Sequence, residues 1–71
     1  MPIDELDLPA LLSQARQLRE RAGMSASATA RQLDVSPATV LKWEAGQRRP
    51  LGANARNYAR FLRRLQKAAA S

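Results

Sequence analysis

Residues 25–44, with the sequence SASATARQLDVSPATVLKWE, contain two helix starts separated by a short turn. Ser25 and Ser36 both suit an N-cap, because a serine hydroxyl accepts a hydrogen bond from an amide that the first helical turn leaves unpaired. Pro37 suits the first position of the second helix, where no amide donor is lost. The stretch therefore predicts two short helices, at about 26–33 and 37–45.

Two further residues fit the ends of these helices. The segment LDVS at 33–36 is too short for anything but a tight turn, and Asp34 within it is of a type that tolerates positive φ. Gly46 is able to end the second helix in the left-handed conformation that commonly follows a helix C-terminus. The pattern is therefore helix, turn, helix.

Apolar residues recur with a helical period on both short segments. The positions expected to face inward are Ala30, Leu33, Val40 and Trp43. Trp43 could also stack on a nucleic-acid base, but its spacing with Val40 favours the core. The outer face of the second helix then carries Ala38, Thr39 and Lys42, a short and partly cationic surface of the kind that a DNA recognition helix presents.

The residues LDVSPATVLKWEAGQRRP at 33–50 resemble the turn, recognition helix and trailing WExGxRxP segment of the Cro/repressor-like, or Xre-type, helix-turn-helix domain. A looser likeness covers about 11–65. The resemblance implies an all-α, compact, lambda-repressor-like helix-turn-helix domain with four helices, or five if the last is broken. Two positions depart from the family pattern. Ala26 stands where a glutamine is usual, and Thr29 stands where a bulky apolar residue is usual.

The same resemblance implies a function. It is that of a sequence-specific regulator of transcription, most commonly a repressor, which binds an inverted-repeat operator in double-stranded DNA as a homodimer. Small proteins of this kind regulate phage, plasmid and toxin–antitoxin operons. The alternative is an antitoxin or other protein-interaction module that binds a toxin or another protein partner, with DNA binding secondary. Leu41 and the apolar side of the last helix would then supply the contact.

Base reading is expected from the residues that open the second short helix and project from it, namely Pro37, Ala38, Thr39 and Lys42. Pro37 and Ala38 offer apolar contact suited to a thymine methyl group, and Thr39 can donate or accept a hydrogen bond. Lys42 is the only long cationic side chain on this face, so its natural target is the O6 and N7 of guanine. The alternative is that Lys42 contacts only phosphate.

Contacts with the DNA backbone are expected from a second set of residues, namely Ser25, Ser36, Gln47, Arg48 and Arg49. Ser36 is placed for a phosphate, either through its hydroxyl or through the amides of the helix start. Residues 47–50, QRRP, form a basic loop. In the family this loop lies along the DNA backbone beside the recognition helix, which makes Arg48 and Arg49 the first choice for phosphate contacts.

Longer helices are predicted on both sides of this unit. The first runs from about Pro9 to Ala22 and carries one apolar stripe, namely Leu11, Ala15, Leu18 and Ala22. Residues 1–7 before it are expected to form a flexible acidic lead. The domain proper is expected at 8–67, followed by a disordered tail at 68–71.

Arg19 falls in the last turn of the first long helix. The resemblance implies that it forms a structural ion pair with Glu44, the glutamate of the WExG segment. On the residues alone, an exposed Arg19 that favours the helix C-terminus is an equal alternative.

The last helix is predicted over about 53–67 and is strongly amphipathic. One side is apolar and is expected to cover the core and in part to contact a second subunit or protein partner; it carries Tyr58, Phe61, Leu62 and Leu65. The other side is a line of cations, Arg56, Arg60, Arg63 and Lys67. A solvated charged face is the alternative for these cations. Binding to anionic lipid is disfavoured, because so small a core needs the apolar side.

Composition narrows the classes of function. The chain has 71 residues, a formal net charge of +6 and a pI of about 11.4, which favours a polyanionic partner, nucleic acid above all. It contains no cysteine and no histidine, the commonest metal ligands and the commonest general base. We therefore expect no enzyme activity, no cofactor and no metal. No apolar run approaches the roughly 20 residues of a membrane span, and the acidic N-terminus is unlike a signal peptide, so a cytoplasmic location is expected.

Overall fold

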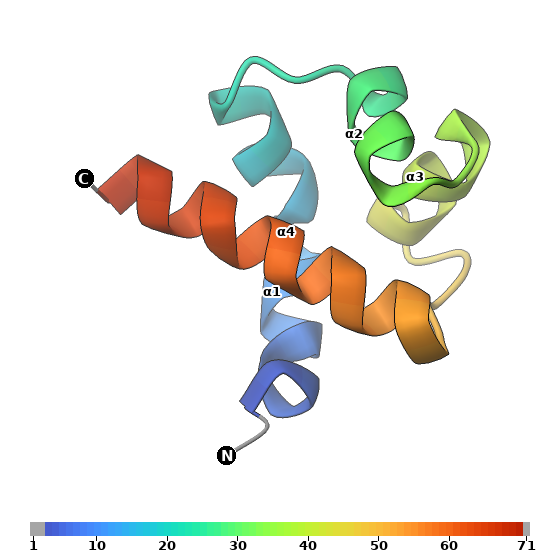
Figure 1. Cartoon of the computed structure of the whole chain (residues 1–71), viewed down its shortest axis with the longest axis horizontal. Helices are drawn as coiled ribbons and strands as arrows, with labels where there is room; N and C mark the ends of the chain where they lie inside the picture. The colour runs from blue at the N-terminus through green and yellow to red at the C-terminus, as the bar shows by residue number, and fades with distance from the viewer. Residues whose placement is uncertain (1–2, 71) are drawn as a thin grey trace.

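The computed structural model describes the backbone of residues 3–70 and the side chains of residues 8–69. Within this part of the chain there are four helices and no strand (Figure 1). The helices are α1 (Ile3–Arg21), α2 (Ala26–Leu33), α3 (Pro37–Glu44) and α4 (Gly52–Ala70). The predicted all-α, four-helix class is confirmed, and α4 is continuous, so no fifth helix forms in the described residues.

Serine hydroxyls cap both short helices. The Oγ of Ser25 accepts a hydrogen bond from the amide of Ala28 at 3.0 Å, and the Oγ of Ser36 accepts one from the amide of Thr39 at 3.1 Å. Both serines are in the extended conformation that an N-cap requires. Local chemistry therefore sets the start of α2 and α3, and their bounds agree with the sequence prediction to within one residue.

The turns between helices use the left-handed conformation. Asp34 has a φ of 58° and its amide donates back to the carbonyls of Ala30 and Arg31, which ends α2. Gly46 has a φ of 72° and follows α3 directly after Ala45. Asp34 is the one residue other than glycine with positive φ among those described. Both turn assignments made from the sequence are confirmed.

The outer ends of the two long helices differ from the prediction. α1 begins at Ile3 and contains Pro9 in its interior, whereas the sequence predicted a start at Pro9 after a flexible lead. Of that lead, residues 1–2 and the side chains of residues 3–7 lie outside what the structure describes. α4 continues past Lys67 to Ala70, since alanine is the best helix former, and Ser71 lies outside the described residues.

The core lies where α4 crosses α1, with α2 and α3 packed to one side (Figure 1). The buried residues that form its main cluster are Leu11, Ala15, Leu18, Leu33, Trp43, Tyr58, Ala59, Phe61 and Leu62. The rings of Trp43 and Tyr58 lie 4.7 Å apart, which joins α3 to α4, and burial raises the pKa of Tyr58. The inward positions predicted for α2 and α3 are all buried. Ala22 is exposed, contrary to prediction, because α1 has already ended.

The apolar side of α4 covers the core, as the sequence predicted. Tyr58, Phe61 and Leu62 are each exposed by no more than 2%. They pack against α1 of the same chain. A chain of this size has few other apolar side chains with which to form a core. Leu65 is half-buried against the same cluster. Tyr58, Phe61 and Leu62 are therefore covered within the chain, while Leu65 keeps part of its surface exposed. A contact of this side with a second subunit or protein partner stays a prediction.

Thr29 occupies a core position with an unpaired hydroxyl. The residue is 1% exposed, and its Oγ1 has no hydrogen-bond partner among the described residues. Burying a hydroxyl without a partner costs free energy that an apolar group of similar shape avoids.

Replacing Thr29 with valine should therefore stabilise the fold. We expect Thr29→Val to raise the free energy of unfolding by about 1 kcal/mol, measured by urea denaturation with the fluorescence of the single tryptophan. Thr29→Ser is the matched control, since it keeps the hydroxyl but removes a buried methyl group, and it should lower stability. A valine variant that is less stable than the wild type would show that the hydroxyl has a partner, such as a buried water.

Candidate nucleic-acid interface

The rotation of α3 about its axis decides which side chains face solvent. Val40 and Trp43 are buried at 0% and 4% exposure, which turns the opposite side of the helix outward. Pro37, Ala38 and Lys42 are exposed on that outer side, and Thr39 is half-buried. The residues predicted to read bases therefore all lie on the first turns or the outer side of α3. Their surface combines small apolar groups with one long cation.

Ser36 and Thr39 form a pair at the start of α3. Besides accepting the amide of Thr39, the Oγ of Ser36 lies 2.8 Å from the Oγ1 of Thr39, in hydrogen-bond contact. This hydrogen bond favours one side-chain orientation of Thr39. The helix start presents two neighbouring hydroxyls and the positive end of the helix dipole, a combination that favours an anion.

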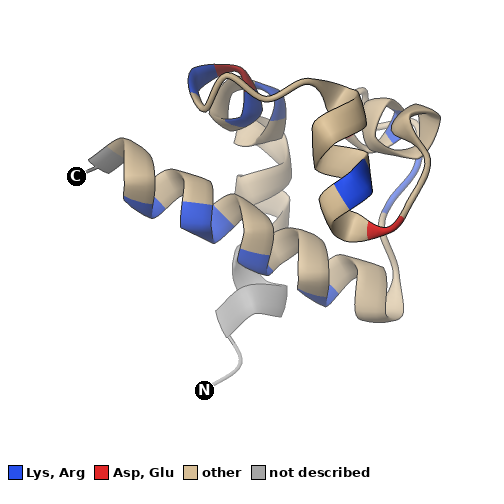
Figure 2. Cartoon of the chain, turned by 45° about the horizontal axis from the view of Figure 1, so that its top comes forward, with Lys and Arg blue, Asp and Glu red and all other residues tan. Residues whose placement is uncertain are grey.

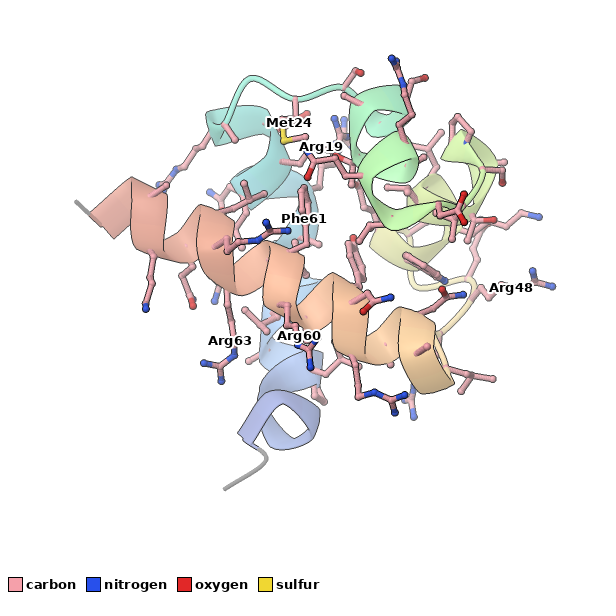
Figure 3. All side chains as sticks on the ribbon, viewed as in Figure 1. Arg19, Met24, Arg48, Arg60, Phe61 and Arg63 are labelled. Atoms are coloured by element: carbon pink, nitrogen blue, oxygen red, sulfur yellow. The ribbon has the colours of Figure 1, made fainter. Side chains whose placement is uncertain are left out.

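The loop after α3 is fastened to the end of that helix. The amides of Gln47 and Arg48 both donate to the carbonyl of Lys42, at 2.9 and 3.3 Å. Pro50 is buried, while the side chains of 47–49 are exposed. The basic loop is therefore placed beside α3 by backbone hydrogen bonds, and its side chains project into solvent, as Figure 3 shows for Arg48.

One hollow joins the loop to the start of α3. It has a volume of about 490 Å³, and four of its lining residues were predicted as site residues, namely Ser36, Thr39, Arg48 and Arg49. Leu51 and Asn54 also line it, and the sequence reasoning missed both. Leu51 is 75% exposed, unusual for leucine, and Asn54 lies in the first turn of α4, directly after the basic loop. Their position in the sequence, just after the basic loop, was the available signal.

The remaining predicted residues do not line this hollow. They are Ser25, Pro37, Ala38, Lys42 and Gln47. Ser25 is exposed at the start of α2, where its hydroxyl caps the helix. The other four are exposed on α3 or on the loop. Four of the nine residues predicted to contact DNA therefore line one hollow, and the other five lie outside it.

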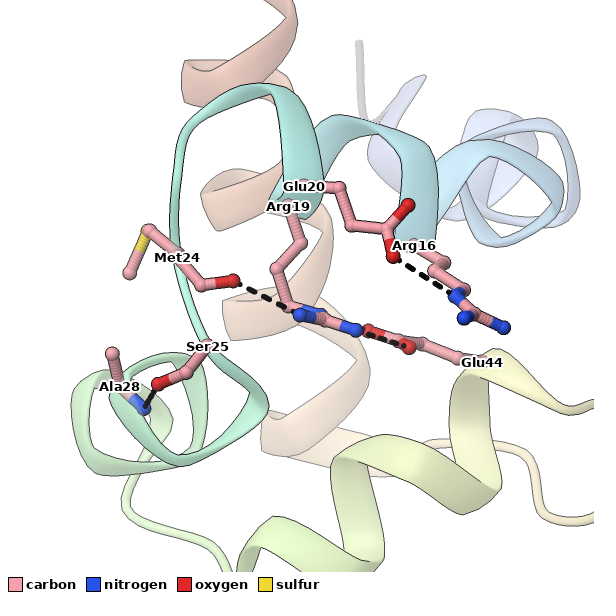
Figure 4. A network of polar contacts seen from close by, with 7 residues as sticks. All are labelled: Arg16, Arg19, Glu20, Met24, Ser25, Ala28 and Glu44. Carbon is pink, nitrogen blue, oxygen red and sulfur yellow. Dashed lines mark hydrogen bonds and ion pairs between the residues drawn. The ribbon is translucent and has the colours of Figure 1, made fainter.

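Arg19 and Glu44 form a bidentate ion pair (Figure 4). The Nε of Arg19 donates to Oε2 of Glu44 at 2.6 Å and Nη2 donates to Oε1 at 3.1 Å. Nη1 donates to the carbonyl of Met24 at 2.9 Å. The two side chains are only 12% and 5% exposed, and the hydrogen bond with Glu44 raises the pKa of Arg19. The pair connects α1, the turn before α2 and the last residue of α3.

Comparison with known families assigns the fold. The family model described as Helix-turn-helix, HTH_3, matches residues 16–65, which is more than half of the chain and includes α2, α3 and the basic loop. The chain belongs to this family. It is accordingly a DNA-binding regulator of transcription. No curated protein and no solved structure matches the chain. None of the helices in the described residues is long and apolar enough to cross a membrane.

The ion pair between Arg19 and Glu44 should contribute substantially to stability. We expect Glu44→Ala to lower the free energy of unfolding by on the order of 3 kcal/mol, because it leaves a buried guanidinium without its partner. Glu20→Ala is the matched control, since Glu20 pairs with Arg16 at 3.2 Å on the exposed surface of α1. That pair should contribute less than about 1 kcal/mol. Equal losses in urea denaturation of the two variants would contradict a structural role for Glu44.

Proposed function

We propose that the protein is a transcriptional repressor that binds an inverted-repeat operator as a homodimer and regulates a phage, plasmid or toxin–antitoxin operon. The observation that supports this most directly is the hollow between the start of α3 and the basic loop. It places two hydroxyls, a helix N-terminus and two guanidinium groups where one phosphate group and its neighbours could lie. An exposed helix face for base reading adjoins it.

Contacts with the DNA divide between two sets of residues in this proposal. The outer side of α3 enters the major groove and reads base edges through Pro37, Ala38, Thr39 and Lys42. Backbone contacts come from Ser25, Ser36, Gln47, Arg48 and Arg49, which fix orientation and register without reading sequence. The exposure of these side chains, with Thr39 alone half-buried, leaves them accessible to a duplex without rearrangement of the core.

The overall dimensions suit two copies on adjacent half-sites. The principal extents of the chain are 31 × 28 × 19 Å. None of these extents exceeds the ~34 Å of one helical turn of DNA, so two copies have room on adjacent half-sites. Because most of the apolar side of α4 is used in the core, the dimer contact would be formed mainly by other surface residues. A bound dimer represses by occupying the promoter, which requires no further contact.

The first test concerns the phosphate contacts. We expect Arg48→Ala and Arg49→Ala each to weaken binding to operator and random DNA alike, because phosphate contacts carry no sequence information. Each lost contact should reduce the slope of log affinity against log salt by about 0.9. Arg16→Ala, which removes the same charge from the exposed surface of α1, is the control and should leave the slope nearly unchanged. An unchanged slope in both loop variants would exclude those arginines from the interface.

The second test concerns base reading by Lys42. We expect Lys42→Ala to cost about 1–3 kcal/mol on the operator and much less on random DNA, because a lysine contact with guanine is specific. Binding-site selection with wild type and variant gives the decisive comparison. The variant should lose preference for guanine at one position of each half-site. Identical consensus sequences of equal sharpness would show that Lys42 contacts only phosphate.

The third test concerns the dimer. We expect sedimentation equilibrium at tens of micromolar to give twice the chain mass of 7.8 kDa, and operator DNA to bind two copies. A half-site oligonucleotide is the control and should bind one copy with much lower affinity. A chain that stays monomeric and binds the full operator as one copy would rule out the dimer.

A further inference from the structure

A basic groove lies between α2 and α4, away from α3 and its loop. It has a volume of about 630 Å³, and its cations are Arg60, Arg63, Arg64 and Lys67. Gln32 and Leu33 of α2 and Asn57 of α4 complete its lining. None of these residues belongs to α3 or to residues 45–51, and no carboxylate of the described residues lines the groove. Figure 3 shows Arg60 near the middle of the view and Arg63 further to the left, both apart from Arg48 at the right.

The cations of the groove follow one side of a single helix. Positions 60, 64 and 67 are four and three residues apart, so their backbone positions rise by about 6 Å and then about 4.5 Å along α4. Figure 2 shows the basic residues of α4 as a row along the helix. The guanidinium of Arg64 lies 5.9 Å from the centre of the Phe61 ring, which is itself 2% exposed. Arg64 is thereby oriented by a cation–π contact with the core.

The charge of α4 is not balanced within the helix itself. No aspartate or glutamate follows Glu44 in the sequence, so α4 contains basic side chains alone among its ionisable groups apart from the buried Tyr58. Arg60 and Arg64 are both exposed. Closely spaced like charges repel, and an oppositely charged ligand in the groove would relieve that repulsion.

We propose that this groove binds an acidic helical segment of a partner protein, with carboxylates on one face at the spacing of Arg60, Arg64 and Lys67. Guanidinium groups pair with carboxylates in bidentate geometry, and arginine clusters are a recurring means of recognising acidic motifs. The carboxamides of Gln32 and Asn57 offer hydrogen bonds to such a segment, and Leu33 offers an apolar contact.

A protein segment fits this groove better than a nucleic-acid backbone does. A DNA backbone would pair with the guanidinium groups of α4 but would make little use of the apolar contact at Leu33, which an apolar side chain of a peptide would use. The groove also shares no lining residue with the hollow between α3 and its loop. The inference goes beyond the proposed repressor function, because it concerns a different ligand on a different surface.

The test uses a defined peptide probe. A fluorescent, alanine-rich helical peptide carries three glutamates at the four-then-three spacing of the cations, and a scrambled peptide of the same composition is its control. Fluorescence anisotropy with the full chain at physiological ionic strength should show about tenfold tighter binding of the spaced peptide, since one charge-assisted hydrogen bond is worth roughly that factor. Equal binding of the two peptides would show that only their net charge matters and not the spacing of the glutamates, which would overturn the proposal.

Matched variants locate the binding site. Arg60→Gln with Arg64→Gln should weaken binding of the spaced peptide by about tenfold or more, whereas Arg48→Gln with Arg49→Gln, which removes the same charge, should leave it nearly unchanged. Thermal unfolding of each variant verifies that the exposed substitutions preserve the fold. Equal losses in both variants would overturn the proposal.

Competition with DNA separates this inference from the proposed function. A duplex of random sequence should not displace the spaced peptide, and the Arg60 and Arg64 variant should retain wild-type affinity for operator. Displacement by the duplex, together with weaker operator binding by that variant, would assign the groove to the nucleic-acid interface instead. Failure of operator binding in the wild type would disprove the repressor proposal and leave the peptide result unaffected.

Discussion

The packing of Trp43 against Tyr58 sets the position of α3, and the exposed face of the protein depends on it. Trp43 is 4% exposed, with its ring centre 4.7 Å from that of Tyr58 on α4. Because successive helical residues are rotated by about 100°, burying this side chain and Val40 turns Ala38 and Lys42 toward solvent. Glu44 follows directly and meets Arg19 of α1. Two adjacent side chains thus connect α3 to both long helices, one by apolar burial and one by a buried ion pair.

The small size of the chain determines how α4 is used. A chain of 71 residues can bury only a modest core. The aromatic side chains and Leu62 of α4 are therefore buried against α1. The exposed side of α4 carries its row of cations, and this row is accessible to another molecule. Interactions made by its exposed side are therefore electrostatic and sensitive to salt, whereas an apolar contact with a second chain must be sought mainly elsewhere on the surface.

Local features of this fold were predictable from sequence, and long-range ones were not. The caps at Ser25 and Ser36 and the left-handed turn at Asp34 depend on residues within one or two helical turns, so the sequence predicts them well. The apolar side of α4 was recognised as such, but periodicity shows which residues share a face and not what covers that face. The same limit explains why the basic groove was missed, since Gln32 and Arg64 come together only through the packing of α2 on α4. Leu51 and Asn54 were missed because only the folded structure shows that they line the hollow beside α3.

Separate surfaces for DNA and for an acidic ligand have a thermodynamic consequence. Any influence of one ligand on the affinity for the other must be reciprocal. With no shared lining residue, the simplest route for such an influence is charge: an acidic segment in the groove lowers the net positive charge of a strongly basic chain. That change weakens the long-range attraction of the chain to phosphates, which is screened beyond about 8–10 Å at physiological salt. Because of this screening, the change in affinity for operator and random DNA would be small at physiological salt and would grow only as the salt concentration is lowered. Base reading by α3 is short-range and would be little altered, so the ratio of the two affinities would stay nearly constant.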